Sequence, residues 1–262
     1  MGSTPPRVLV TRPAGEAQPW ADSLQSHGIA AEALPLIEIA PLADDAALRA
    51  HWAWVPEQAA LMFVSANAVR HFMAAQPAGL AGPACQAWST GPGTQAALLA
   101  AGWPREQVRS PAADGARFDS EALWALVQAD VQGWRGRSVL IVRGADAQGQ
   151  LAGRDWLAQR LHEAGVQVLQ CVAYVRRAPV LDAAMRARAL QALHDGSWWL
   201  FSSSEAANNL AQLLPPQAIG PQACALATHP RIAERLRAQG WGRVQEVPAT
   251  LAAQVASIKC LT

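Results

Sequence analysis

The stretch QCVAYVRRAP, residues 170–179, has a counterpart near the N-terminus, LPLIEIAP, at residues 34–41. Each is a short apolar run with partial alternation, each follows a segment with helical spacing of its apolar residues, and each contains or ends at a proline. Alternation of this kind is typical of extended segments, and proline favours the end of a strand. The pair predicts two matching extended segments in a chain that repeats itself.

The repeat extends outward from these two segments. Residues 7–39 and 138–175 share the order strand, arginine, loop, amphipathic helix, glycine and strand. Two later pairs of segments also match: 61–73 with 199–213, and 84–103 with 223–241. A period of this length indicates duplicated halves and not the short repeats of a solenoid. Because strands alternate with helices throughout, we expect two similar lobes of the α/β class with parallel sheets.

The periodicity of apolar residues places the individual elements. Five strands are predicted in each half, at residues 8–10, 34–39, 60–64, 86–88, 107–110, 139–142, 167–175, 198–201, 223–227 and 244–247. Helices are predicted at residues 17–27, 46–54, 66–75, 94–101, 121–131, 153–164, 182–194, 205–214 and 231–239, and from 250. If the paired segments at 34–41 and 170–179 connect the lobes, one lobe is discontinuous, 1–38 plus 176–262, and the other is 39–175.

Composition excludes several classes of protein. The 262 residues carry a formal net charge of +1 with no basic cluster, which argues against a nucleic-acid binder. No apolar run approaches the roughly 18 residues of a membrane span, and no leader sequence precedes the first strand, so we expect a cytoplasmic protein without a membrane contact. The four cysteines lack metal-ligand spacing, so neither a disulfide nor a metal site is expected.

The order and spacing of eight segments together resemble the uroporphyrinogen-III synthase family over nearly the whole chain. The segments are VLVTRPAGEA (8–17), LPLIEIAP (34–41), FVSANAV (63–69), TGPGTQAAL (90–98), VLIVRG (139–144), VAYVRR (172–177), FSSSEAANNL (201–210) and THPRIAERLRAQGW (228–241). The resemblance implies two flavodoxin-like lobes with parallel sheets, a two-stranded connector and an active site in the cleft.

The resemblance also implies a reaction of heme and tetrapyrrole biosynthesis. Hydroxymethylbilane, a linear tetrapyrrole with eight carboxylates, loses water and closes to uroporphyrinogen III with its last pyrrole ring inverted. The enzyme would be a cyclising lyase that needs no cofactor. The family further favours a monomer, and an unstable substrate is compatible with transient contact with the preceding enzyme of the pathway.

Tyr174, the only tyrosine in the chain, is the candidate catalytic residue. The resemblance places a tyrosine here to assist departure of the substrate hydroxyl, a role that suits a weak general acid. The alternative is a structural tyrosine that pins the connector.

The candidate substrate-binding residues follow strands, where ligands gather in open α/β sheets. They supply hydroxyls, arginine side chains and backbone amides at helix N-termini, all suited to carboxylates. They are Arg12, Ser65, Asn67, Thr90, Gly91, Gly93, Arg143, Ser202, Ser203 and Thr228. The alternatives are helix caps for the hydroxyl residues and ion pairs within a lobe for the two arginines. Arg176 and Arg177, on the connector, are not assigned to the site.

Two other functions remain open from the sequence. One is a non-catalytic two-lobed sensor that binds a tetrapyrrole or another small anion. The other is a dinucleotide enzyme, because residues 91–96 fit G-x-G-x-x-A after a strand. The turn follows a late strand and no acidic residue ends the next one, which disfavours the dinucleotide interpretation.

Overall fold

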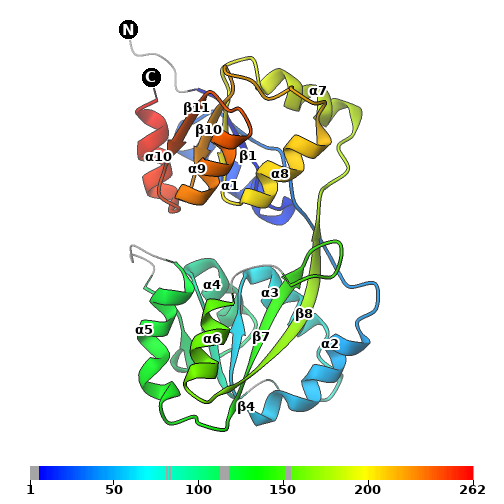
Figure 1. The fold of residues 1–262 in the computed structure, drawn as a ribbon, viewed down its shortest axis with the longest axis vertical. Coiled ribbons are helices and arrows are strands. Elements are labelled where there is room, and N and C mark those ends of the chain that lie inside the picture. Colours follow the sequence, from blue (N-terminus) through cyan, green and yellow to red (C-terminus); the bar gives the residue numbers. More distant parts are fainter. Residues whose placement is uncertain (1–5, 81, 83, 113–117, 152–154, 262) are drawn as a thin grey trace. The chain divides into compact units, whose positions relative to one another are not determined.

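A computed structural model describes residues 6–80, 82, 84–112, 118–151 and 155–261. The predicted start of the helix at residues 153–164 lies outside these residues. The chain has a mixed α/β fold with parallel sheets, so the predicted class is confirmed. It divides into two compact units, a first unit of Met1–Ile39 with Arg177–Thr262 and a second unit of Ala40–Arg176 (Figure 1).

The first unit is built on a five-stranded sheet. Its strands are β1 (Val8–Val10), β2 (Ala31–Ala33), β9 (Trp198–Phe201), β10 (Cys224–Ala227) and β11 (Arg243–Glu246), in the order β11-β10-β9-β1-β2 with every pair parallel. Its helices are α1 (Ala14–Ser26), α7 (Ala183–Ala192), α8 (Ser204–Leu213), α9 (Pro230–Ala238) and α10 (Leu251–Lys259).

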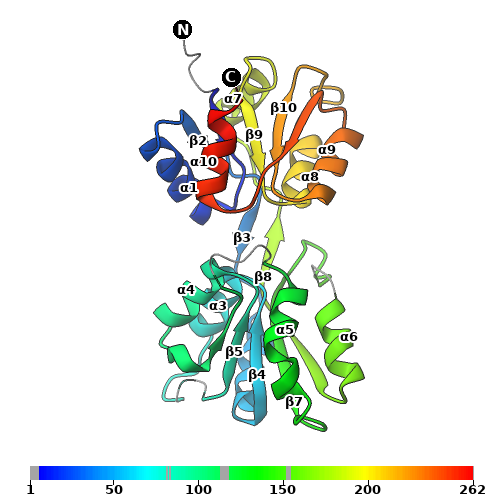
Figure 2. The same cartoon turned by 90° about the vertical axis from the view of Figure 1, so that its left-hand side faces the viewer.

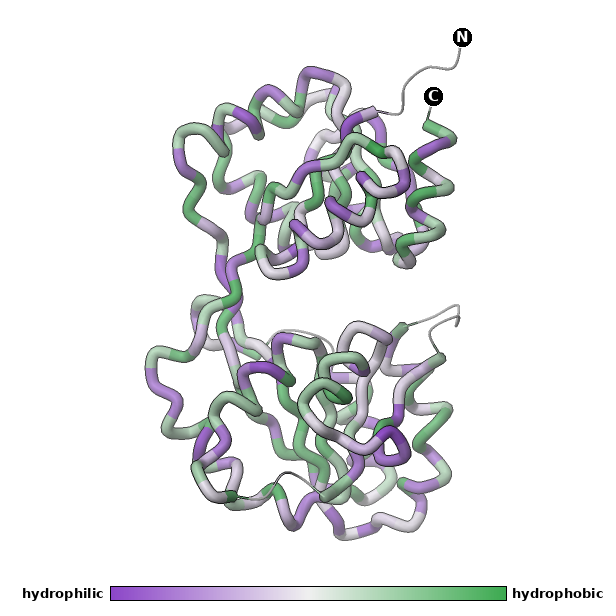
Figure 3. The backbone as a smooth tube through the Cα atoms, turned by 180° about the vertical axis from the view of Figure 1, so that it is seen from behind, coloured by the Kyte–Doolittle hydropathy of each residue, from purple (hydrophilic) through white to green (hydrophobic). Residues whose placement is uncertain are grey.

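Helices bury both faces of this sheet, and the side chains of each strand point alternately to one face and the other. Leu9 and Trp199 pack toward α7, α8 and α9, while Val8, Trp198 and Leu200 pack toward α1 and α10. Figure 2 shows α1 and α10 on one side of the sheet and α8 and α9 on the other. Strands covered on both faces read as continuous apolar runs, and Figure 3 shows apolar segments, in green, within both units.

A second parallel sheet organises the second unit. The sheet has the order β3-β8-β7-β4-β5-β6, with β3 (Glu38–Ala40), β4 (Gln58–Phe63), β5 (Gln86–Ser89), β6 (Val108–Arg109), β7 (Ser138–Ala145) and β8 (Gln167–Arg177). The pairs from β8 to β6 are parallel. The helices are α2 (Ala46–His51), the 3-10 turns η1 (Trp52–Glu57) and η2 (Arg105–Gln107), α3 (Ala66–Ala74), α4 (Pro92–Ala100), α5 (Ser120–Val131) and α6 (Trp156–Glu163).

The second sheet is also covered on both faces. Met62, Trp88 and Ile141 pack against α5 and α6. On the other face Phe63 meets Phe72 of α3 edge to face, with ring centroids 5.7 Å apart. None of the helices among the described residues is long and apolar enough to cross a membrane.

The strand order repeats the duplication seen in the sequence. In each sheet the first strand of the repeat, β1 or β7, lies between the second, β2 or β8, and the third, β9 or β4. The carboxyl ends of the first and third strands flank the point where the strand order reverses, which is where open α/β sheets bind ligands. The repeat therefore points to the same edge in both units.

The predicted strand at residues 34–39 is wrong in its bounds. The structure has two short strands there, β2 before it and β3 at its end, with Pro35 in the interruption. Proline has no N–H for a strand ladder. Leu34 and Leu36 instead donate their backbone N–H groups to Val10 and Thr11, and Asn209 donates to the carbonyl oxygen of Leu36 at 2.7 Å.

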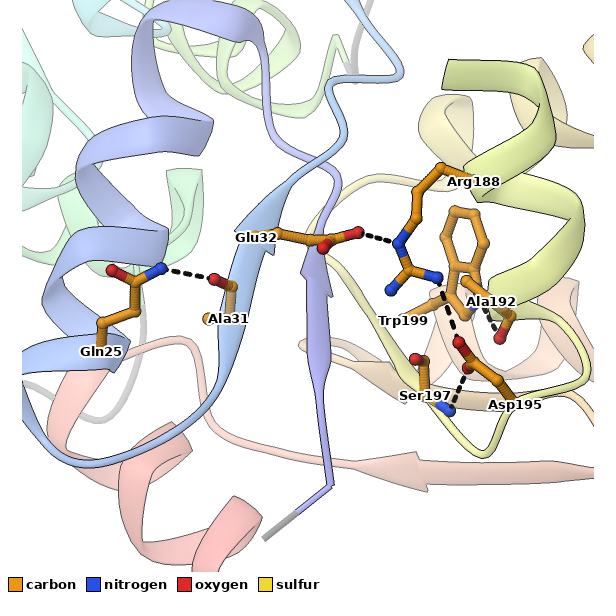
Figure 4. A network of polar contacts seen from close by, with 8 residues as sticks. All are labelled: Gln25, Ala31, Glu32, Arg188, Ala192, Asp195, Ser197 and Trp199. Carbon is orange, nitrogen blue, oxygen red and sulfur yellow. Dashed lines mark hydrogen bonds and ion pairs between the residues drawn. The ribbon is translucent and has the colours of Figure 1, made fainter. Parts of the chain in front are cut away.

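Arg188 of α7 connects three segments of the first unit (Figure 4). Its guanidinium donates to Glu32 of β2 and, at 3.1 Å, to Asp195 in the loop before β9. Asp195 also accepts from the backbone N–H of Ser197 at 3.0 Å. Burial favours a higher pKa for Asp195, but the hydrogen bonds from Ser197 and Arg188 outweigh it and lower the pKa.

Arg188→Met should lower the free energy of unfolding of the first unit by about 1–3 kcal/mol, since two charge-assisted hydrogen bonds are lost. A carboxylate with a depressed folded-state pKa stabilises above its unfolded pKa, about 3.9, and this contribution is lost as the pH falls through the folded pKa. The difference in the free energy of unfolding between Arg188→Met and the wild type, measured by urea unfolding, should therefore shrink below about pH 4.

Arg49→Met is the matched control, because Arg49 pairs with Asp45, four residues earlier, and both side chains are exposed. Its cost should stay below about 1 kcal/mol. An equal loss in both variants, or a pH-independent loss at Arg188, would contradict the role of this network.

Candidate functional site

The second unit has a cavity of about 290 Å³ at the carboxyl edge of its sheet. Its lining comes from the residues after β4 and β5, from the late parts of β7 and β8, and from the beginnings of α5 and α6. The polar lining residues are Ser65, Thr90, Asp119, Ser120, Arg143, Tyr174 and Arg176. Four residues predicted for the site, one from each of β7 and β8 and one after each of β4 and β5, thus share one cavity.

Ser65 and Tyr174 form a hydrogen bond within this lining. Ser65 is the N-cap of α3, and its Oγ accepts from the backbone N–H of Ala68 at 3.1 Å. The same Oγ lies 3.0 Å from the phenolic oxygen of Tyr174. The tyrosine is only 2% exposed, so its hydroxyl lies at the wall of the cavity and not on an open surface.

Gly144 makes room for the tyrosine ring. The register between β7 and β8 shifts between Arg143 and Gly144, which places Gly144 opposite Tyr174. A Cβ added at Gly144 would lie 2.6 Å from two ring carbons of Tyr174. Only a residue without a side chain fits this contact.

His71 of α3 covers the tyrosine from another side. The two rings stack with centroids 5.5 Å apart and an interplanar angle of 26°. Burial, together with the positive charge of Arg70, lowers the pKa of His71. The neutral imidazole therefore predominates at neutral pH, and His71 packs as a flat, uncharged surface.

Arg143 is almost fully buried, and its Nη1 donates to Asp155 at 3.0 Å. The structure therefore contains the ion pair within a unit that was the alternative to substrate binding for Arg143. The side chain of Asp155 is 71% exposed. Arg176 lines the same cavity two residues after Tyr174 on β8. Residues two apart on a strand share a face, a signal that could have singled out Arg176 more firmly from the sequence.

Asn67 and the glycine turn lie beside the cavity but are not part of its lining. Asn67 is largely buried and accepts from Arg70 at 2.6 Å. Gly91 is the N-cap of α4, and a Cβ added there would lie 3.5 Å from the side chain of Phe118, while Gly93 lies in the first turn of α4. Of the turn, Thr90 alone reaches the cavity.

Four candidate residues belong to the first unit, after β1, β9 and β10. Arg12 lies over the ring of Trp20 at 3.8 Å and pairs with Glu16 at 3.6 Å. Burial lowers the pKa of Arg12, and the charge of Glu16 opposes this shift. Ser203, which follows Ser202, is the N-cap of α8, and its Oγ accepts from the backbone N–H of Glu205.

The expectation that Thr228 caps the following helix is wrong. The N-cap of α9 is His229, whose Nδ1 accepts from the backbone N–H of Arg231 at 3.1 Å. Thr228 lies one residue earlier, at the end of β10, and its backbone N–H donates to Phe201. A helix that begins at Pro230 takes its cap from the residue before the proline, so the hydroxyl of Thr228 is not used there.

Sequence reasoning did not assign Phe118, Asp119 or Ser120 to the site. Asp119 caps α5, accepting from the backbone N–H of Ala122 at 2.8 Å. The start of α5 lines the cavity at the sheet edge, but the sequence before α5 belongs to none of the repeated segments. No periodic signal links it to β4 or β8.

The cavity suits anionic groups and weak acid catalysis. It combines four hydroxyls and two arginine side chains with apolar walls from Val64 and Phe118. The nearby thiol of Cys171 is no nucleophile at neutral pH, because burial raises its pKa to about 12. Among the described residues, no three His, Cys, Asp or Glu side chains gather as a metal site would need.

Comparison with known proteins identifies a family and similar folds. Residues 18–255 match the family model described as uroporphyrinogen-III synthase HemD. A mutant uroporphyrinogen III synthase from Thermus thermophilus is similar in structure, with 18% identity, 97% of each chain covered and a TM-score of 0.57. The uroporphyrinogen-III synthetase of Helicobacter pylori shares 16% identity over 98% of this chain and 100% of its own, with a TM-score of 0.52.

At such identities the structures support the fold alone, whereas the family model covers most of the chain. The chain belongs to the uroporphyrinogen-III synthase family.

Proposed function

We propose that this protein is a uroporphyrinogen-III synthase, a lyase that dehydrates and cyclises hydroxymethylbilane to uroporphyrinogen III. The family match over residues 18–255 carries the proposal. The cavity at the carboxyl edge of the second unit supports it, because hydroxyls and arginines there suit a substrate with carboxylate side chains.

Tyr174 is proposed as the general acid. As the C–O bond of the substrate breaks, the phenolic proton passes to the departing oxygen and water leaves. The electron pair of the adjacent pyrrole nitrogen forms the new C=N bond of an azafulvenium ion, and the phenolate later regains a proton from the ring that closes. The substituted carbon of the last pyrrole attacks the methylene carbon of this ion and gives a spiro intermediate. The bond from that pyrrole carbon to the methylene bridge of the preceding ring then breaks. The freed bridge carbon bonds to the unsubstituted alpha carbon of the last pyrrole, which loses its proton, and the last ring is thereby inverted.

Most of the remaining work is positioning, which raises the rate by bringing reacting atoms together. In the second unit we propose that Ser65, Asn67, Thr90, Gly91, Gly93 and Arg143 hold the substrate. In the first unit we propose Arg12, Ser202, Ser203 and Thr228. The family assignment and the place of these residues after parallel strands support the proposal.

We also propose that the two units are flavodoxin-like lobes joined by β3 and β8, with boundaries near residues 38 and 176. The shared strand order supports this reading, as does the change of unit at Ile39 and Arg177. The overall reaction involves no net oxidation or reduction, so no cofactor is required. A cytoplasmic monomer, in transient contact with the enzyme that makes its substrate, completes the proposal.

A coupled assay tests the function. Hydroxymethylbilane is generated in situ, the protein is added, and the oxidised products are separated into type I and type III uroporphyrins. Without an enzyme the intermediate closes directly to type I, so a switch to type III is the expected result. If protein that circular dichroism shows to be folded yields type I uroporphyrin alone, the proposal is contradicted. The result would then favour a non-catalytic sensor that binds a tetrapyrrole or another small anion.

A further inference from the structure

We infer that Ser65 is a positioning residue for Tyr174, donating its hydroxyl proton to the phenolic oxygen so that the phenolic proton points into the cavity. The inference rests on the proposed function, since it concerns how Tyr174 delivers a proton. For Ser65 it replaces the direct substrate contact proposed above with a contact that acts through Tyr174.

The hydrogen-bonding capacity of serine allows this direction. A serine hydroxyl has one donor and two acceptor sites. The backbone N–H of Ala68 occupies one acceptor site at 3.1 Å, and the phenolic oxygen of Tyr174 lies 3.0 Å away. If Tyr174 donated to Ser65, its proton would be held inside the protein and could not reach a leaving group. The reverse direction leaves that proton available.

The same direction favours the charge that develops during the reaction. A phenolic oxygen that releases its proton becomes negative, and a hydrogen bond to a charged atom is stronger than one between neutral groups. The backbone N–H of Ala68 lies in the first turn of α3 and polarises the hydroxyl of Ser65, because donors in a chain strengthen one another. The N-terminus of α3 thus acts on Tyr174 through Ser65.

Both partners are held in place. Ser65 has the extended backbone of an N-cap, with φ −162° and ψ 162°. The tyrosine ring is confined by the backbone of Gly144 and the imidazole of His71. The oxygen-to-oxygen contact therefore does not depend on a mobile side chain, as a preorganised catalytic group requires.

Ser65→Ala should lower kcat roughly 10- to 100-fold, the value of one hydrogen bond to a charged group. KM should change by less than about twofold, because an interaction gained only in the transition state does not affect ground-state binding. Ser65→Thr keeps the hydroxyl and should return kcat to near the wild-type value. Ser65→Asp keeps an N-cap acceptor but has no proton to donate at neutral pH, so its kcat should stay low.

Asp182→Ala is the matched control for loss of a helix cap. Asp182 caps α7 by accepting from the backbone N–H of Met185 at 2.7 Å, in the first unit. This variant should lose similar stability to Ser65→Ala but keep kcat. A rise in KM with unchanged kcat in Ser65→Ala, or an unchanged kcat in folded protein, would overturn the inference.

A second measurement needs no substrate. Because the chain has a single tyrosine, incorporation of 3-fluorotyrosine gives one ¹⁹F resonance, from position 174. Ser65→Ala should shift this resonance and Asp182→Ala should leave it unchanged; equal spectra for all three proteins would show that the hydrogen bond is absent. Wild-type protein that yields only type I product would instead contradict the proposed function, whatever the spectra show.

Discussion

Tyr174→Phe is expected to lower the rate of type III formation by about 10²- to 10⁴-fold, the usual contribution of a general acid. Phenylalanine keeps the ring that packs on Gly144 and His71 and removes only the oxygen. Departure of hydroxide then lacks a proton donor, while spontaneous closure to type I continues. The products of the coupled assay, separated by chromatography, should therefore shift toward type I.

The fold should survive this change. The lost contact is one hydrogen bond, to Ser65, so the free energy of unfolding should fall by about 0.5–1.5 kcal/mol. Ser257→Ala is a suitable control, since it removes a hydroxyl that donates to Ala253 at 2.9 Å in α10 and should keep the wild-type rate. A Tyr174→Phe protein with wild-type kinetics would identify Tyr174 as a structural residue that holds Ser65 in place.

The α/β class and the parallel arrangement could be predicted because duplication and periodicity act along the chain. The interruption of the strand around Pro35 could not be predicted. The matching segment of the second half is one continuous strand, β8, and gives no sign of it. Apolar residues there are buried with or without a strand ladder: Leu36 is fully buried between β2 and β3. Burial produces the hydrophobic pattern, and the pattern therefore does not reveal which backbone groups pair.

The candidate cavity shows a similar division. That Ser65, Thr90 and Arg143 lie near one edge of the sheet could be predicted, because each was expected directly after a strand of a parallel sheet. The burial of Tyr174 was not predictable, because it depends on the register shift opposite Gly144. A register is a property of two strands together, and a single sequence contains no direct record of it.

Gly144→Ala should damage both stability and activity. The added Cβ would lie 2.6 Å from two carbons of the Tyr174 ring and 3.0 Å from its oxygen, so the ring or strand β7 must move. Such overpacking costs about 1–3 kcal/mol. Displacing the hydroxyl by about 1 Å is enough to lower the rate by roughly 10²-fold. Urea unfolding and the coupled assay measure the two effects.

Gly15→Ala separates this clash from the general effect of replacing a glycine. Nothing lies within 4 Å of a Cβ added at Gly15, which is in the first turn of α1. Alanine is the better helix former by up to about 1 kcal/mol, so this variant should be as stable as wild type or slightly more stable. Equal destabilisation at both positions would mean that the tyrosine ring is not the cause.

A double-mutant cycle then tests the contact itself. In a Tyr174→Ala background the ring is gone, and Gly144→Ala should cost less than about 0.5 kcal/mol, leaving a coupling energy of about 1–3 kcal/mol. Coupling of this size would mean that Gly144 is required because of Tyr174. Additive costs would mean that Gly144 is needed for the backbone of β7 alone, and the loss of activity in Gly144→Ala would then follow from the strand and not from a displaced tyrosine.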